Sequence, residues 1–197
     1  MKKRFILLSF IIAIGILLVG CNNSKDENIY VDFKKAEISS EQPIGADMVN
    51  LDYASDDIIV FHDYFGLFIY SINEGKIISS IDLEDIDCNK TQGDESCEVS
   101  VSNDGKIVQL HNISSEYMYV YSVEEQTLMK IDYISLNNSF KLVKTKDIIN
   151  QTESLYSYGA VKFQDGDFGY LALKGNTINS LEYIRGNKRI KVFNEYF

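Results

Sequence analysis

The sequence predicts an all-β protein built from small antiparallel sheets. From Met48 onward, apolar or alternating runs of four to seven residues are separated by turn signals. The chain is also rich in Ile, Tyr, Phe and Val, which favour strands. After residue 20 no segment sustains a helical period for long, and the best helical candidate is the short stretch Leu142–Asn150.

Internal repetition supports this fold class and refines it. The run Leu67–Ile72 corresponds, 51 residues later, to Met118–Val123. The flanks agree, because Ile59–His62 corresponds to Val108–His111 and Lys76–Ile78 to Thr127–Met129. A third and weaker unit spans Ser157–Phe193, with strands expected near Val161, Tyr170, Leu181 and Ile190.

Each repeat contains a strand ending in His, a loop, a strand ending in Tyr-Ser, a tight turn and another strand. This is the layout of a β-propeller blade. Turns are expected at Asn73-Glu74-Gly75, Asn103-Asp104-Gly105, Asp165-Gly166, Gly175-Asn176 and Gly186-Asn187. Propellers close with about four to eight blades, so we expect three to four antiparallel, propeller-like sheets that form an incomplete propeller or close with another chain.

The N-terminus carries an export signal. Lys2, Lys3 and Arg4 precede an apolar run, Phe5–Val19, that is short for a bilayer-spanning helix. It ends in Leu18-Val19-Gly20-Cys21, which resembles the lipobox of bacterial lipoproteins. The resemblance implies cleavage after residue 20, acylation of Cys21 and attachment to the lipid bilayer on the extracytoplasmic face of the cell membrane. The alternatives are an uncleaved membrane anchor and an ordinary signal peptide.

Three regions follow from these patterns: a signal peptide at 1–20, a lipid-anchored tether with a first strand at 21–47, and the β domain at 48–197. Removal of residues 1–20 changes the formal net charge from −10 to −13. So acidic a surface would be repelled by phosphate, which argues against nucleic acid as a partner. The same negative charge does not argue against cationic partners or metal ions.

Cys88 and Cys97 bracket a polar loop between two predicted strands. In an exported protein this arrangement predicts a disulfide that staples a hairpin, and two free thiols are the alternative. The eight intervening residues match no standard zinc or redox spacing.

The candidate sites are otherwise weak. His62 and His111 occupy equivalent repeat positions, which favours a structural hydrogen bond to a neighbouring strand over a shared ligand site. Tyr117, Tyr119 and Tyr121 alternate along one strand, and we expect them in the core, with a stacking platform as the alternative. The densest acidic patch is a solvated face or a docking site for a cation or partner: Asp82, Glu84, Asp85, Asp87, Asp94 and Glu95.

Two further resemblances bear on function. Asn103–Lys106 followed by Tyr119–Ser122 resembles the repeats of bacterial surface propellers of the WD40 or YVTN kind. Separately, a set of segments is similar to the extracytoplasmic C-terminal region of Firmicute membrane metallopeptidases of the β-lactam-sensor type: Leu51–Ala54, Phe65–Phe68, Cys88–Ser102 and Ser180–Gly186. The peptidase part of that family, with its His-Glu-x-x-His motif, is absent, so neither zinc nor proteolysis is implied.

No catalytic constellation and no cofactor motif is recognisable in the chain after residue 20. We therefore expect a membrane-anchored extracytoplasmic binding or sensing module on a Firmicute-type membrane, with a protein partner or a cell-wall ligand. The alternative is an envelope hydrolase with an unidentified carboxylate site.

Overall fold

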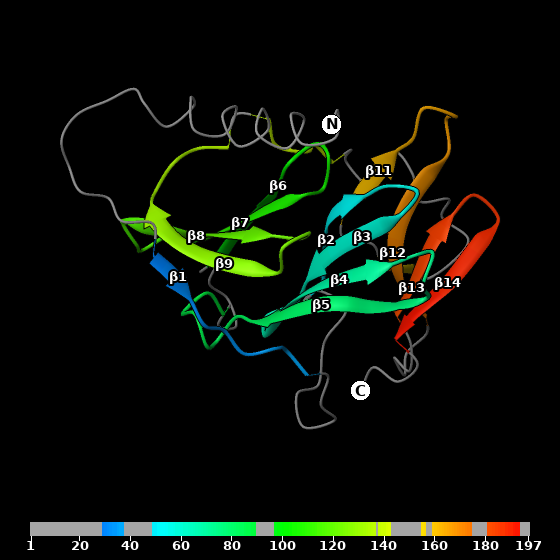
Figure 1. Ribbon diagram of the computed structural model, residues 1–197. Coiled ribbons are helices and arrows are strands. Elements are labelled where there is room, and N and C mark those ends of the chain that lie inside the picture. The colour runs from blue at the N-terminus through cyan, green and yellow to red at the C-terminus, as the bar shows by residue number, and fades with distance from the viewer. Residues whose placement is uncertain are drawn as a thin grey trace, which may run out of the picture.

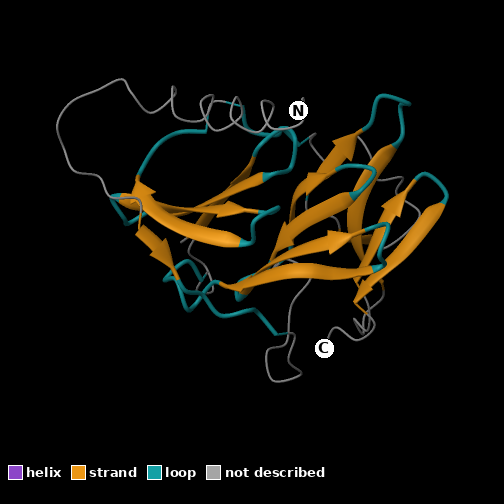
Figure 2. Cartoon of the chain, viewed as in Figure 1, coloured by secondary structure: helices purple, strands orange, loops and turns teal. Residues whose placement is uncertain are grey.

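The computed structural model describes residues 29–37, 49–89, 97–136, 138–142, 155–156, 159–174 and 181–193. Regular structure in these residues is entirely β, and the strands form three antiparallel sheets (Figures 1 and 2). The all-β prediction is confirmed.

The first sheet is a four-stranded meander in chain order. It contains β2 (Asn50–Ala54), β3 (Ile58–His62), β4 (Gly66–Ser71) and β5 (Lys76–Asp82). The predicted turn at 73–75 joins β4 to β5, and Gly75 adopts a positive φ of 66° there. Glycine adopts such a conformation without a steric penalty, whereas the equivalent position of the second repeat holds Gln126 at a φ of 53°.

The second sheet repeats this meander and confirms the internal repeat. Its strands are β6 (Cys97–Val101), β7 (Ile107–Asn112), β8 (Tyr117–Ser122) and β9 (Thr127–Asp132). A fifth strand, β1 (Ile29–Val31), pairs with the outer edge of β9. The sequence equivalences thus place β3 with β7, β4 with β8 and β5 with β9.

The third sheet corresponds to the weak third repeat. Its strands are β10 (Leu155–Tyr156), β11 (Ala160–Lys162), β12 (Phe168–Lys174), β13 (Leu181–Arg185) and β14 (Lys188–Phe193). Both β10 and β11 pair with β12, one after the other, and therefore act as a single interrupted first strand. The strands expected near Val161, Tyr170, Leu181 and Ile190 are all present.

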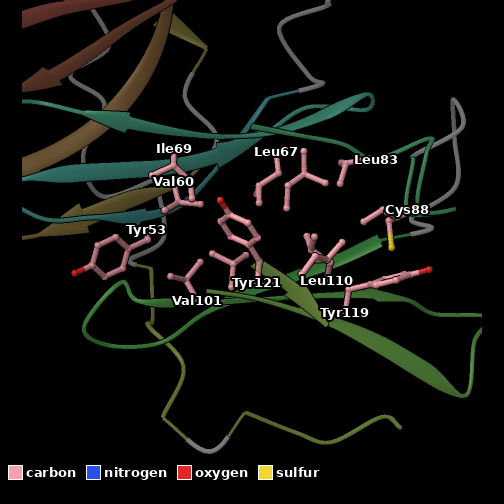
Figure 3. Close-up of a cluster of buried hydrophobic side chains, with 14 residues drawn as sticks. Tyr53, Val60, Leu67, Ile69, Leu83, Cys88, Val101, Leu110, Tyr119 and Tyr121 are labelled. Carbon is pink, nitrogen blue, oxygen red and sulfur yellow. The ribbon is translucent and has the colours of Figure 1, made fainter. Parts of the chain in front are cut away.

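Alternation along the strands of the first sheet creates two separate cores. In β4, Phe68 and Tyr70 face the third sheet, whereas Leu67 and Ile69 face the second sheet. Every residue of β4 is consequently buried. Figure 3 shows the second of these cores, where apolar side chains of the first and second sheets interlock.

The first sheet therefore lies between the other two, although it comes first in the chain (Figure 1). In a run of consecutive propeller blades the second and third sheets would be neighbours, whereas here the first sheet separates them. The described sheets are blade-like meanders that form an open stack. The segment after β9 turns back toward β6, where Phe140 donates a 2.7 Å backbone hydrogen bond to Val101. The Phe140 ring also packs 4.7 Å from that of Tyr53 on β2.

One predicted turn depends on a close approach between two sheets. Gly105, between β6 and β7, has a φ of 72°. A Cβ atom at this position would lie 2.6 Å from the ring of Tyr53 on β2. Glycine is therefore required both by the backbone conformation and by the packing of the first sheet against the second.

The segment that follows β1 joins the outer edges of two sheets. While β1 pairs with β9, the carbonyl oxygen of Lys34 accepts a 2.8 Å hydrogen bond from the backbone of Asp82 at the end of β5. The Ser80 hydroxyl donates to the carbonyl of Ala36 at 3.0 Å. The strand expected within 21–47 is thus β1, and its continuation braces the first sheet.

Several sequence predictions fall outside the described residues. These are the signal peptide, the acylation site Cys21, the tether up to Asn28, the turn Gly175-Asn176 and, except for Leu142, the candidate helix. In the described ranges there is no helix long and apolar enough to cross a membrane.

Candidate binding cleft between the first and third sheets

A cleft of about 470 Å³ opens where turns of the first and third sheets meet. One wall is the end of β2 with its following turn, and the other is the end of β11 with its following turn. The lining residues are Ala54, Ser55, Asp56, Phe140, Val161, Lys162, Phe163, Gln164, Asp165 and Arg185.

Arg185, the last residue of β13, holds the two walls together. Its Nη1 donates to the carboxylate of Asp56 in the β2–β3 turn. Its Nη2 donates to Asp165 Oδ2 in the β11–β12 turn at 2.8 Å. The guanidinium also stacks on the ring of Phe163, with Cζ 3.6 Å from the ring centroid. A planar cation suits this combination of two carboxylates and an aromatic face.

These contacts favour the charged forms of Arg185 and Asp165. The Asp56 carboxylate, followed by that of Asp165, raises the pKa of Arg185. The pKa of Asp165 is lowered, first by the backbone N–H of Asp167 and then by Arg185. Because an ion-paired carboxylate with a lowered pKa is a poor proton donor near neutral pH, Asp165 is unsuited to general acid catalysis.

Tyr183 on β13 lies near this cluster in the core. The residue is 1% exposed, and its hydroxyl has no hydrogen-bond partner among the residues that the structure describes. Burial raises the pKa of Tyr183 to about 12.

A Cβ atom at Gly169, on the paired strand β12, would lie 2.2 Å from the Tyr183 hydroxyl, so only glycine fits beside it.

His62 hydrogen-bonds a neighbouring strand, as the repeat predicted, whereas His111 hydrogen-bonds the turn that follows its own strand. His62 Nδ1 lies 2.7 Å from Asp52 Oδ2, and Asp52 sits at a β-bulge in β2. Burial raises the pKa of Asp52, and the neighbouring His62 opposes this shift. His111 Nε2 donates to the Ser115 carbonyl at 3.0 Å, and its Nδ1 lies 3.6 Å from Glu98 Oε2, beyond hydrogen-bond distance.

The acidic patch does not converge on one point where it is described. Asp82 Oδ1 accepts hydrogen bonds from the backbone N–H groups of Glu84 and Asp85, which is turn chemistry. Asp85 pairs with Lys34 at 2.7 Å. Glu84 and Asp87 are exposed, and Asp94 and Glu95 lie outside the described residues. Nowhere in the described ranges do three or more His, Cys, Asp or Glu side chains form a group that could hold a metal ion.

Cys88 and Cys97 are brought together as thiols at the end of the second sheet. Cys88 is buried, and Cys97 begins β6. Interaction with the Cys88 side chain, followed by burial, raises the pKa of the Cys97 thiol. The oxidation of this pair in the exported protein remains a prediction.

The tyrosine row on β8 belongs mainly to the core. Tyr121 is 0% exposed and Tyr119 is 7% exposed, whereas Tyr117 is partly buried. Lys130 on β9 covers the Tyr117 ring, with Nζ 3.4 Å from the centroid. The row is therefore not an open stacking platform.

Comparisons with known proteins do not add to this picture. No protein-family model and no curated protein matches the chain.

Sequence reasoning did not identify the cleft. In the sequence, Arg185 stands out only as part of the segment Ser180–Gly186, and no motif marks Asp56, Lys162 or Phe163. The available signal was an arginine directly before the Gly186-Asn187 turn and an acidic pair, Asp56-Asp57, in another turn. Nothing local to either turn shows that the two meet.

Proposed function

We propose that this protein is a lipid-anchored extracytoplasmic binding module that uses the cleft between its first and third sheets to hold a cell-wall ligand. The observation that supports a binding role is the cleft itself, with its walls joined by Arg185. The lipobox-like sequence ending in Cys21 supports the anchored location.

The chemistry of the lining favours a polar ligand without strong net charge. Two cationic side chains, Lys162 and Arg185, face two acidic ones, Asp56 and Asp165. Phe140 and Phe163 add apolar surface, and Gln164 and Ser55 add hydrogen-bonding groups. A few polar groups on an aromatic-lined wall are typical of ligand sites. Short peptides carrying amino sugars, as in cell-wall fragments, match this mixture.

Hydrolysis is less well supported by the same geometry. A glycoside hydrolase needs one carboxyl group with a raised pKa as the acid and a second carboxylate as base or nucleophile. Here both carboxylates of the cleft pair with Arg185, and the pKa of Asp165 is lowered. A binding role requires no such acid.

Anchoring is tested by labelling cells with a palmitate analogue. Wild-type protein should carry the label and fractionate with membranes, and Cys21→Ala should lose the label. Cys88→Ala, another cysteine variant, should keep it and serves as the control. Equal labelling of wild type and Cys21→Ala would overturn the lipid-anchor proposal.

Binding is tested with a defined probe, a mixture of muropeptides released from purified peptidoglycan. Wild-type protein should bind the mixture in calorimetric titration. Lys162→Ala, which removes an exposed lining charge, should weaken binding, whereas Lys188→Ala, exposed but outside the lining, should not. Absence of binding, or equal losses in both variants, would refute a cell-wall ligand in this cleft.

A further inference from the structure

Exposed apolar side chains gather at one end of the second sheet. The described residues include six large hydrophobic side chains that are exposed, and five of them belong to this end. Leu142 is the exception. We call the five the apolar end, with exposed fractions as follows: Ile29 58%, Tyr30 67%, Ile113 50%, Tyr133 49% and Ile134 55%.

Three chain segments bring these residues together where β9 finishes. On the edge strand β1, Ile29 lies opposite Lys130 of β9. Directly after β9, the Tyr133 ring packs 4.2 Å from that of His111 on β7, and Ile134 N lies 3.3 Å from Met118 Sδ on β8. Ile113 lies in the β7–β8 turn at the same end. Figure 1 shows the end of β9 beside the start of β1.

The second argument is the short sequence distance between the apolar end and the proposed acylation site. Only residues 22–28 separate Cys21 from Ile29. The eight residue steps from Cys21 to Ile29 span at most roughly 29 Å when fully extended. An acyl group on Cys21 would therefore keep Ile29, and with it this end of the sheet, close to the bilayer surface.

We propose that the apolar end is the surface with which the anchored protein rests on the bilayer. This inference depends on the lipid anchoring proposed above. Tyrosine rings are enriched at the membrane–water interface, and isoleucine side chains gain by entering the boundary between headgroups and acyl chains. Because the tether holds this surface close to the bilayer, a weak intrinsic affinity is sufficient for contact.

The surrounding charge specifies the kind of lipid. Glu98, Glu116 and Asp132 are exposed at this end of the sheet, and the amino group of Lys130 covers the ring of Tyr117. Anionic headgroups would be repelled by these carboxylates. The contact is accordingly apolar, and zwitterionic lipid is the appropriate probe.

The chain contains no tryptophan, so a single introduced Trp reports its own environment. The full acylated protein is reconstituted into phosphatidylcholine vesicles with or without brominated acyl chains. Tyr133→Trp and, as a second reporter on the edge strand, Tyr30→Trp should each lose about half of their emission to the brominated chains, as expected for a ring at the interface. Glu125→Trp, exposed in the β8–β9 turn at the opposite end of the same sheet, should lose none.

The outcomes separate this inference from the anchoring proposal. If both reporters escape quenching while the protein is acylated and bound to vesicles, the apolar end does not face the bilayer, although anchoring stands. If the protein carries no acyl group and does not associate with vesicles, both proposals fail. Shielded but unquenched reporters together with a cross-linked dimer would assign the apolar end to a second copy of the chain, and the bilayer contact would be wrong.

Discussion

The hydroxyl of Tyr121 on β8 lies 2.5 Å from the Ser79 hydroxyl on β5, a contact between residues 42 positions apart that joins the second sheet to the first. Its equivalent in the first repeat, Tyr70 on β4, donates to the Lys191 carbonyl on β14 at 3.5 Å. Each tyrosine thus reaches the outermost strand of the next sheet in the stack. The repeat therefore recurs in the packing between sheets as well as within them.

Truncation of either tyrosine side chain should strongly destabilise the fold. Tyr121 is 0% exposed and Tyr70 is 3% exposed. Tyr121→Ala and Tyr70→Ala should each lower the free energy of unfolding by about 3 to 5 kcal/mol, the range for large aromatic truncations. Tyr121→Phe, which removes only the hydroxyl, should cost about 0.5 to 1.5 kcal/mol. Denaturant melts of the chain from Lys25 onward measure these changes.

The matched control is Tyr30→Ala, because this tyrosine is 67% exposed on an edge strand. Its effect should stay within about 0.5 kcal/mol, as for surface substitutions generally. Similar losses at positions 30 and 121 would contradict the assignment of Tyr121 to the core.

Removal of the His62 imidazole should destabilise the first sheet in a pH-dependent way. His62→Ala leaves the nearly buried Asp52 carboxyl without its 2.7 Å partner, at a cost of about 1 to 3 kcal/mol. Burial already raises the pKa of Asp52, and loss of His62 should raise it further. At a pH between the unfolded and the folded pKa of Asp52, the native state holds a proton on this carboxyl that the unfolded state has lost. The stability of the variant should therefore fall as pH rises from about 4 to 7.

Unfolding midpoints of His62→Ala at several pH values check this prediction. Asp52→Asn combined with His62→Ala should remove the part of the pH dependence that comes from position 52, because the amide does not titrate. If the single variant is equally stable at pH 4 and pH 7, the proposed role of Asp52 is wrong.

The Asp165 carboxylate should contribute to acid sensitivity with the opposite sign. Its pKa is lowered in the folded state by the Asp167 backbone N–H and by Arg185. Its contribution is fully present above the unfolded pKa of about 4 and is lost as pH falls through the lower folded value. Asp165→Asn should therefore flatten the decline of the unfolding midpoint below about pH 4. An unchanged acid profile in this variant would show that Arg185 and Asp167 do not act on Asp165.

The Cys88–Cys97 pair should be oxidised in the exported protein. Cys97 packs against the core cluster that contains Cys88. Closing this ring should stabilise the fold by about 2 to 3 kcal/mol on the loop-entropy model. Non-reducing mass spectrometry of freshly isolated protein should find one intramolecular disulfide and no alkylatable thiol besides any unacylated Cys21. Two alkylatable thiols at positions 88 and 97 would refute it.

Most strand positions could be predicted from the sequence because their signals are local. The apolar run Leu67–Tyr70 and the turn residues Asn73-Glu74-Gly75 lie within one hairpin, and a similar strand and turn recur in β8 and β9. The short strand β10, two residues long, carried too little pattern to be recognised. The paired position of His62 with a neighbouring strand also followed from the repeat, although its partner Asp52 did not, because a β-bulge shifts the register there.

The sequence by itself determined the all-β class, the repeated meander, most turns and the alternation that gives each strand two faces. Only the tertiary structure decided which sheet each face meets, that the first sheet lies between the other two, and that Arg185 meets Asp56 across 129 residues. The physical reason is that alternation and turn preferences act between residues a few positions apart. The pairing of faces depends on complementary shape and charge among side chains that are distant in the chain and become neighbours only on folding.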